Sequence, residues 1–218
     1  MLKFWQSSVG KKVVMGLTGL VLVGFVIGHM AGNMQVFMGP ERFNGYAKLL
    51  KHDLIEITWL VRITLLVSVV LHALAAYQLT MRNWAARPVD YAMREPQVST
   101  YASRTMRWGA VYLFIFLILH IGQFTLGWKW LLPEYTAEGA YGNVVLAFAR
   151  IQWVVLYLGA MFFLALHLYH GTWAVLRTLG VAQPSAQPLQ RRAPLIIALV
   201  VTVGFSLVPL GVALGVVR

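Results

Sequence analysis

The sequence contains no cysteine and few charged residues. The absence of Cys from its 218 residues excludes disulfides, thiolate-held iron–sulfur clusters, thioether-linked haem and cysteine nucleophiles. A redox metal would have to be held by histidine, methionine or carboxylate. Charged residues make up 11% of the chain and hydrophobic residues 59%, whereas soluble domains have about 25% charged residues. These proportions exclude an ordinary soluble domain.

Acidic residues are the scarcer of the charged residues. The chain has 7 Asp and Glu against 18 Lys and Arg, which gives a net charge of +11. In a membrane protein such an excess usually reflects cytoplasmic loops and contact with anionic lipid. We therefore expect membrane lipid, and no nucleic acid, among the partners.

Five long apolar stretches occupy most of the chain, at about 13–38, 57–81, 108–128, 151–176 and 195–217. Each is close to the roughly 20 residues that cross a hydrocarbon core about 30 Å thick. Irregular backbone cannot face lipid, so each should be a helix. The sequence thus predicts an all-α integral membrane protein, with residues 1–218 forming a single membrane domain. The first stretch is too long for a signal peptide and lacks a small-residue cleavage site, so we expect it to be retained.

The connecting segments suggest an orientation. With a cytoplasmic N-terminus, 11 of the 18 basic residues lie inside, and five of the seven acidic residues lie outside. This bias predicts a cytoplasmic N-terminus. We expect the membrane to be the cell inner membrane. In the first outer loop, apolar residues recur at helical spacing between charged ones, which predicts a short interfacial helix at about 41–54. Proline is expected in or beside loops at Pro40, Pro88, Pro96, Pro133, Pro184, Pro188 and Pro194, and inside a span only at Pro209.

Four histidines lie deep within the first four spans, one in each: His29, His72, His120 and His167. Ionisable residues inside a membrane are rare and usually face a functional interior. A single one is often a hydrogen-bonded packing residue, but one on each of four consecutive helices indicates a common site. Two further histidines, His170 and His52, lie one turn beyond His167 and in the outer loop. We expect His170 to pack near the site, not to be a ligand.

Two of the four lie at one depth. His72 and His167 each stand ten residues before an arginine, Arg82 or Arg177, that marks the inner boundary. At a rise of 1.5 Å per residue, both are about 15 Å from that boundary. The arginines themselves are expected to act as positive-inside anchors.

The other two lie further out. His29 is 17 residues beyond Lys12 and His120 is 13 beyond Arg107, so both are about 20–25 Å from the inner boundary. Two levels with two helices each predict two stacked b-type haems in a bundle of the first four helices, each iron between two imidazoles. The predicted axial ligands are His29 with His120 for the outer, distal haem, and the remaining two for the inner, proximal haem.

Other residues fit this interpretation but allow a simpler one. Gly24, Gly28 and Gly32 surround His29 at four-residue spacing. They leave room for a flat macrocycle, or they simply allow close helix packing. Arg62 lies at the outer end of its span, where it contacts a haem propionate or extends to the interface.

Several segments resemble the cytochrome b subunit of succinate:quinone and quinol:fumarate oxidoreductases, of the single-anchor, five-helix, dihaem type (the b558 family). The resemblance covers most of residues 7 to 178, and the fifth span carries no distinguishing motif. The matching segments are Ser7-Ser8-Val9-Gly10-Lys11-Lys12, Met15-Gly16-Leu17-Thr18-Gly19, Gly28-His29-Met30-Ala31-Gly32-Asn33, Phe43-Asn44-Gly45-Tyr46-Ala47, Arg87-Pro88 with Tyr91, Tyr101-Ala102-Ser103-Arg104-Thr105-Met106, and His167 with Gly171 and Trp173.

The resemblance implies the same pairs of haem ligands, and its pattern of His167, Gly171 and Trp173 selects His167 over His170 as the ligand. It implies a flavoprotein subunit with the dicarboxylate site and an iron–sulfur subunit, both on the cytoplasmic side. Electrons would pass between the iron–sulfur subunit and a membrane quinone through the two haems. Menaquinone is the quinone that the resemblance favours. The reaction belongs to the complex, and its direction, the haem potentials and any further oligomerisation of the heterotrimer stay open.

Two other classes of protein stay in view. The cytochrome b subunits of nitrate reductases, hydrogenases and formate dehydrogenases are also dihaem proteins, but their histidines tend to pair closely on one helix. A haem-free transporter or structural membrane protein could use the histidines as proton or substrate sites.

The quinone site has two candidate locations. On the outer side, Glu56 and His52 stand with Asp53 at the entrance to the second span, and a titratable group of this kind could move the quinol protons. A solvated cluster of interfacial charges is the simpler interpretation. The inner alternative involves Ser8, Lys12, Trp84 or Arg104.

Overall fold

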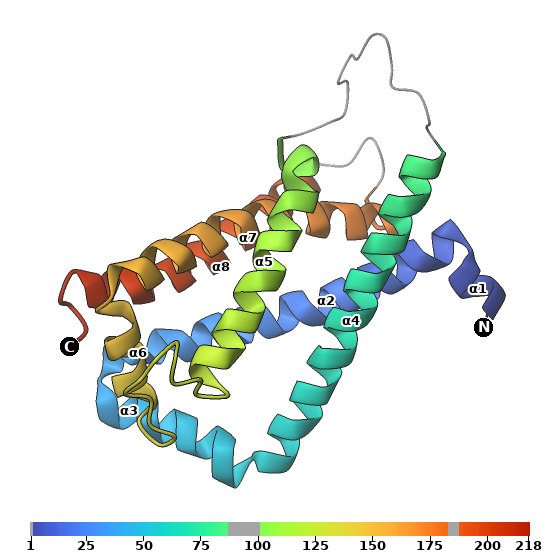
Figure 1. The fold of residues 1–218 in the computed structure, drawn as a ribbon. Helices are drawn as coiled ribbons and strands as arrows, with labels where there is room; N and C mark the ends of the chain where they lie inside the picture. The colour runs from blue at the N-terminus through green and yellow to red at the C-terminus, as the bar shows by residue number, and fades with distance from the viewer. Residues whose placement is uncertain (1, 87–100, 183–187) are drawn as a thin grey trace.

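The computed structural model describes residues 2–86, 101–182 and 188–218 (Figure 1). All regular elements in these ranges are helices. They are α1 (Leu2–Gln6), α2 (Ser8–Asn33), the 3-10 helix η1 (Met34–Met38), α3 (Pro40–Lys48), the π-helix η2 (Leu49–Asp53), α4 (Ile55–Ala85), α5 (Tyr101–Phe124), α6 (Ala140–Phe148), α7 (Ile151–Thr178) and α8 (Pro188–Ala213).

Five of these segments are long and apolar enough to cross a membrane: Ser8–Met38, Ile55–Ala85, Tyr101–Phe124, Ile151–Thr178 and Arg192–Ala213. The expected all-α fold with five spans is confirmed in this respect, and the chain is a multi-pass membrane protein. Several helices extend beyond the predicted limits. Hydropathy identifies only the part inside hydrocarbon, whereas backbone hydrogen bonds continue into the polar flanks.

Three details of the prediction were wrong. The fifth span was expected to reach residue 217, but α8 ends at Ala213. The third span was expected to reach residue 128, but α5 ends at Phe124. The chain turns back there because Gly127 has a φ of +62°, and the Trp128 amide donates to the Gly122 carbonyl at 2.8 Å. Pro194 was expected beside a loop, but it lies inside α8, which begins six residues earlier. Near a helix end, the carbonyl that a proline leaves unpaired can find another partner.

The long helices pack around α2 and α7. Helix α2 packs along α4, α7 and α8, and α7 packs also along α5 and α8. Helices α4 and α5 each have one long neighbour among the described residues, and in Figure 1 they cross the layer of α2, α7 and α8. The C-terminal end of α4, the N-terminal end of α5 and the N-terminal end of α2 lie toward one end of the molecule.

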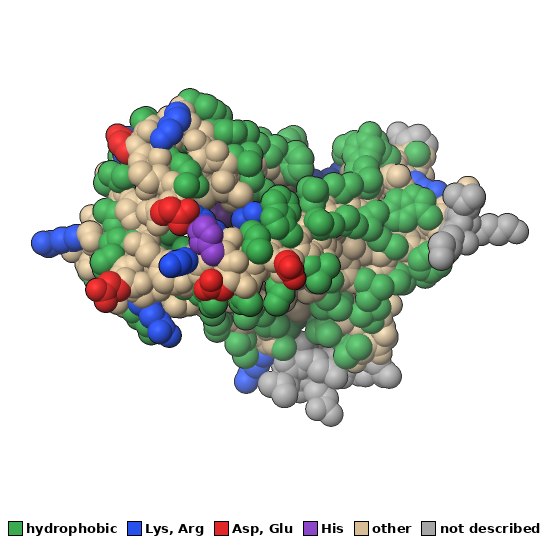
Figure 2. Space-filling model, turned by 90° about the horizontal axis from the view of Figure 1, so that it is seen from below, with side chains coloured by type: hydrophobic (Ala, Val, Ile, Leu, Met, Phe, Trp, Pro, Cys, Tyr) green, Lys and Arg blue, Asp and Glu red, His purple; other side chains and the backbone are tan. Residues whose placement is uncertain are grey.

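The opposite end is covered by short elements. The helix expected at about 41–54 is present as α3 followed by η2, and α6 packs against α3, although no helix was predicted at 140–148. The Tyr141 amide donates to Asn44 Oδ1 at 2.9 Å, and Lys51 Nζ donates to the Ala137 carbonyl. Figure 2 looks onto this end, where acidic and basic side chains gather beside extensive hydrophobic surface.

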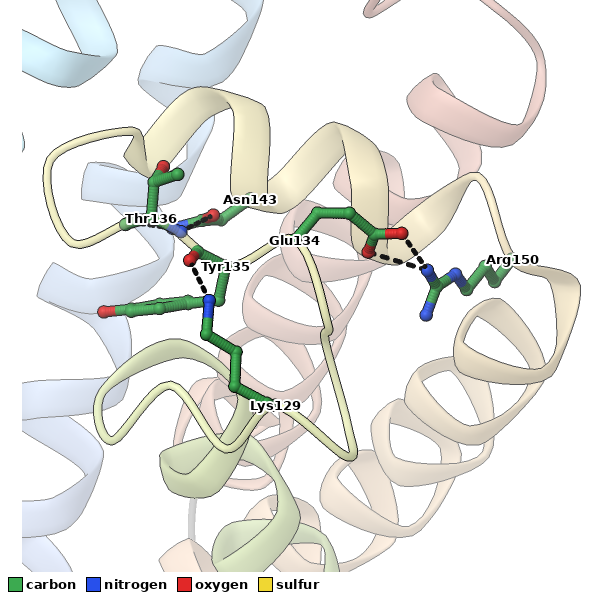
Figure 3. Close-up of polar contacts among 6 residues, drawn as sticks. All are labelled: Lys129, Glu134, Tyr135, Thr136, Asn143 and Arg150. Carbon is green, nitrogen blue, oxygen red and sulfur yellow. Dashed lines mark hydrogen bonds and ion pairs between the residues drawn. The ribbon is translucent and has the colours of Figure 1, made fainter.

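The loop from residue 125 to residue 139 is held by local polar contacts (Figure 3). Asn143 accepts from the Thr136 amide at 3.0 Å and donates to its carbonyl at 2.7 Å. Arg150 Nη2 lies 2.8 Å from a carboxylate oxygen of Glu134, and Lys129 donates to the Tyr135 carbonyl at 2.6 Å. The ion pair is partly exposed and contributes little stability, so the Asn143 contacts and buried side chains such as Leu132 hold the loop in place.

Candidate functional site

The first pair of half-buried histidines joins α2 to α5. The ring centroids of His29 and His120 lie 5.8 Å apart, with the ring planes at 74°. Phe25 stacks on His29 at 5.2 Å, and Phe116 stacks on His120 at 5.6 Å. Phe205 of α8 lies 5.6 Å from His29. Aromatic side chains thus surround both imidazoles.

The second pair joins α4 to α7. The ring centroids of His72 and His167 lie 6.0 Å apart, with the ring planes at 53°. The structure therefore brings together the same two pairs that the depth of the residues in the sequence predicts.

The observed helix ends place the pairs at two levels. His72 stands 13 residues before the end of α4 at Ala85, and His167 stands 11 before the end of α7 at Thr178. At 1.5 Å per residue they lie about 17–20 Å from those ends.

The depth of the outer pair, His29 with His120, is counted from the N-terminal ends of α2 and α5. His29 is 21 residues after the start of α2 at Ser8, and His120 is 19 after the start of α5 at Tyr101, which corresponds to about 29–32 Å. The levels are thus roughly 10–15 Å apart along the bundle.

Each pair connects two helices that do not otherwise pack along each other. Within the described residues, α2 with α5 and α4 with α7 are absent from the packed helix pairs. Two imidazoles therefore meet across each diagonal of the four-helix arrangement. Cofactors of helix bundles occupy this kind of position.

The spacing within each pair fits a metal ion between two imidazoles. Two metal–nitrogen bonds of about 2 Å place the nitrogens about 4 Å apart, and the ring centroids stand further back, in line with 5.8 and 6.0 Å. The described residues contain no group of three or more His, Cys, Asp or Glu side chains that could hold a bare metal ion. Two protein ligands are what a haem iron requires, because the macrocycle supplies the other four.

The hydrogen bonds of His72 support a ligand role. Its Nδ1 lies 3.0 Å from the Met15 carbonyl and 3.4 Å from Thr18 Oγ1. The carbonyl can only accept, so Nδ1 carries the hydrogen and Nε2 keeps a free lone pair. Metal-bound histidines usually donate their other ring N–H in this way, which fixes the tautomer and orientation of the ring.

His120 has an equivalent partner from a side chain. Its Nδ1 lies 3.1 Å from the hydroxyl of Tyr157, which donates to Gln123 Oε1 at 2.9 Å. The other two rings differ. His29 Nε2 lies 3.4 Å from Asn33 Nδ2, and His167 Nδ1 is buried with no hydrogen-bond partner among the described residues. A buried polar atom without a hydrogen-bond partner costs about 1–3 kcal/mol of stability.

The glycines near the histidines have different surroundings. A Cβ built at Gly24 or Gly28 would meet nothing within 4 Å, and both glycines are exposed on α2. A Cβ at Gly19 would lie 3.4 Å from the His72 ring. At Gly32 the space is instead filled by the Tyr46 side chain. The expectation that Gly24 and Gly28 make room for a macrocycle stays a prediction, whereas Gly32 serves helix packing.

The remaining outer residues of the prediction lie apart from the histidine pairs. Arg62 is exposed on α4, with its guanidinium 5.1 Å from the centroid of the Trp59 ring. Glu56 is exposed in the first turn of α4. His52 Nε2 lies 3.4 Å from a carboxylate oxygen of Glu138, and both side chains are exposed. His52, in η2, and Glu56, in the first turn of α4, therefore belong to the charged end of the molecule.

At the other end, the inner candidates do not form one cluster. Ser8 Oγ accepts from Arg82 at 3.4 Å, and Trp84 lies under the guanidinium of Arg107 at 5.2 Å. Lys12 and Arg104 are exposed. Other predicted features lie outside the described residues: Arg87 with Pro88, Tyr91, Arg94, Pro96 and Pro184. His170 is half-buried on α7, one turn beyond His167.

Sequence reasoning missed several residues beside the imidazoles. Tyr157 contacts His120, Gln123 accepts a hydrogen bond from Tyr157, and Phe205 brings the fifth helix to His29. Gln123 was detectable, because it lies one turn after His120 as a polar residue within an apolar span. Tyr157 and Phe205 carry no such signal.

No protein-family model matches the chain, and neither a curated protein nor a solved structure matches it significantly.

Proposed function

We propose that the chain is the dihaem cytochrome b membrane anchor of a succinate:quinone or quinol:fumarate oxidoreductase. The observation that carries the proposal is the two pairs of half-buried histidines, His29 with His120 and His72 with His167, at two levels. Within the described residues, the two helices of each pair do not otherwise pack along each other. The resemblance of residues 7 to 178 to that family supports the particular complex.

In this proposal each histidine pair holds one haem b through its ring nitrogens. Bound haem would supply one-electron transfer through its iron. The Met15 carbonyl and the Tyr157 hydroxyl hold the rings of His72 and His120 in the tautomer whose Nε2 has a free lone pair. Phe25 stacks on the His29 ring and restricts its rotation.

The same proposal places the chain among its partners. A flavoprotein and an iron–sulfur subunit would bind on the cytoplasmic side of a cell inner membrane, where the N-terminus of this chain would also lie. Quinone, with menaquinone favoured, would react at one of two ends. The outer candidate is the charged end that contains Glu56 and His52, and the inner candidate lies near Ser8 and Trp84.

An optical spectrum of the purified chain or complex tests the proposal. We expect two haems b per chain and the paired alpha bands of bis-histidine haem. Replacing His167 with Ala should remove one haem. Replacing His52 with Ala is the matched control and should remove none, because its ring pairs with Glu138 on the surface. A wild-type chain without haem bands would support the haem-free class of membrane protein instead.

A second experiment separates this complex from other quinone-linked cytochromes b. Affinity purification of the tagged chain from native membranes should recover a flavoprotein and an iron–sulfur subunit with succinate dehydrogenase activity. Recovery of a hydrogenase, formate dehydrogenase or nitrate reductase catalytic subunit would refute the assignment while leaving the haem sites intact.

A further inference from the structure

A buried chain of hydrogen bonds ends on one of the four central histidines. His120 Nδ1 lies 3.1 Å from the Tyr157 hydroxyl, and that hydroxyl lies 2.9 Å from Gln123 Oε1. Gln123 is completely buried and Tyr157 is 7% exposed. Such groups cannot exchange this bonding for water, so each bond matters more than it would at the surface.

The Tyr157 ring is held in one orientation. The Phe116 ring lies 4.8 Å from it at 85°, and the Phe148 ring lies 4.9 Å away at 84°. Edge-to-face contacts of this kind stabilise a particular geometry. The Tyr157 hydroxyl therefore stays beside His120 without any loss of side-chain freedom when a ligand binds.

The bonds have one consistent direction. The amide oxygen of Gln123 can only accept, so the Tyr157 O–H donates to it. The Tyr157 oxygen is then free to accept from His120 Nδ1–H. This assignment leaves His120 Nε2 with its lone pair, which is the form that binds a metal ion.

The inner pair is built differently. Nδ1 of His72 faces the Met15 carbonyl, a backbone group that no substitution removes. His120 instead depends on a side chain of another helix. A substitution at Tyr157 therefore changes the partner of one ligand in the outer pair and leaves the inner pair untouched.

Resting on the dihaem function proposed above, we propose that Tyr157, oriented by Gln123, is a positioning residue that sets the tautomer and the electron-donating strength of His120, and thereby the redox potential of the outer haem. An acceptor on Nδ1–H makes the imidazole a stronger donor and favours the oxidised iron. Removing that acceptor favours the reduced iron.

The test is a redox titration of both haems in the purified complex carrying Tyr157→Phe. The phenylalanine keeps the aromatic packing and removes only the hydroxyl. We expect both haems to remain, the midpoint potential of the outer haem to rise, and that of the inner haem to stay unchanged. Gln123→Met, which removes only the acceptor behind the hydroxyl, should shift the same potential upward by less.

Tyr112→Phe is the matched control. The Tyr112 hydroxyl also joins α5 to α7, through the Leu156 carbonyl at 3.0 Å, and its ring packs on Phe163. Within the described part of the chain, no hydrogen bond or ring contact joins Tyr112 to a histidine. We expect both potentials to remain at their wild-type values in this variant. An equal shift in Tyr112→Phe would trace the effect to helix packing and overturn the positioning role.

Other outcomes separate this inference from the function on which it rests. If the wild-type chain binds both haems and Tyr157→Phe leaves both potentials unchanged, the positioning role is wrong and the proposed function stands. If Tyr157→Phe fails to assemble, Gln123→Met decides, and an unchanged outer potential there rejects the role. A wild-type chain without haem overturns the proposed function and the positioning role with it.

Discussion

If each iron lies between the two histidines of one pair, combined substitutions must follow a simple rule. A variant with His29→Ala and His120→Ala removes both ligands of the outer haem and none of the inner one. A variant with His29→Ala and His72→Ala removes one ligand from each. The two variants lose the same number of imidazoles, so a difference between them reports on pairing alone.

The structure predicts how much the haem content of the two variants differs. The two levels lie roughly 10–15 Å apart along the helices, and each ring centroid is about 6 Å from its partner (5.8 and 6.0 Å). No imidazole can therefore serve both irons, and the losses should be independent. We expect two haems per chain in the wild type, one in the same-pair variant and none in the cross-pair variant.

Haem per chain, measured as the pyridine haemochrome against protein concentration, distinguishes these values. The reduced-minus-oxidised spectrum then shows which component survives in the same-pair variant. A variant with His52→Ala and His170→Ala is the matched control, because it also loses two imidazoles but neither belongs to a pair. It should retain both haems.

One pattern would refute the pairing. If the variant lacking His29 and His72 kept one haem while the variant lacking His29 and His120 lost both, the irons would lie between α2 and α4 and between α5 and α7. The diagonal arrangement would then be wrong, although the chain would still be a dihaem protein.

Three further substitutions have defined outcomes. His170→Ala alone should retain both haems in the optical spectrum, and loss of either would make this residue a ligand. If the outer end reacts with quinol, Glu56→Gln should lower quinone-linked turnover by about 100-fold or more, since a general base is lost. Dye-linked activity at the flavoprotein should survive in Glu56→Gln. Glu41 is another exposed carboxylate of that end, and Glu41→Gln should leave quinone-linked turnover unchanged. Wild-type turnover in Glu56→Gln would mean that quinone reacts at the inner end. Gly122→Ala should destabilise the chain by about 1–3 kcal/mol and lower its thermal unfolding midpoint in detergent, because the added Cβ would overlap the Trp128 ring; an unchanged midpoint would show that this ring moves freely.

The five spans could be predicted from the sequence because a membrane allows few solutions. Lipid offers no hydrogen bonds to the backbone, so an apolar stretch of sufficient length must be helical. The constant rise of a helix also converts sequence position into depth. Hydropathy and counting therefore predict the two levels of His29 with His120 and His72 with His167, and the structure places each pair together.

Packing decided what hydropathy cannot express. The end of α5 at Phe124 depends on the fit of Trp128 against Gly122, and α6 depends on its contacts with α3. The approach of Tyr157 to His120 spans 37 residues of sequence. Depth alone leaves open which way a side chain faces around its helix axis. The rotation and pairing of the helices settle that, and only the tertiary structure determines them.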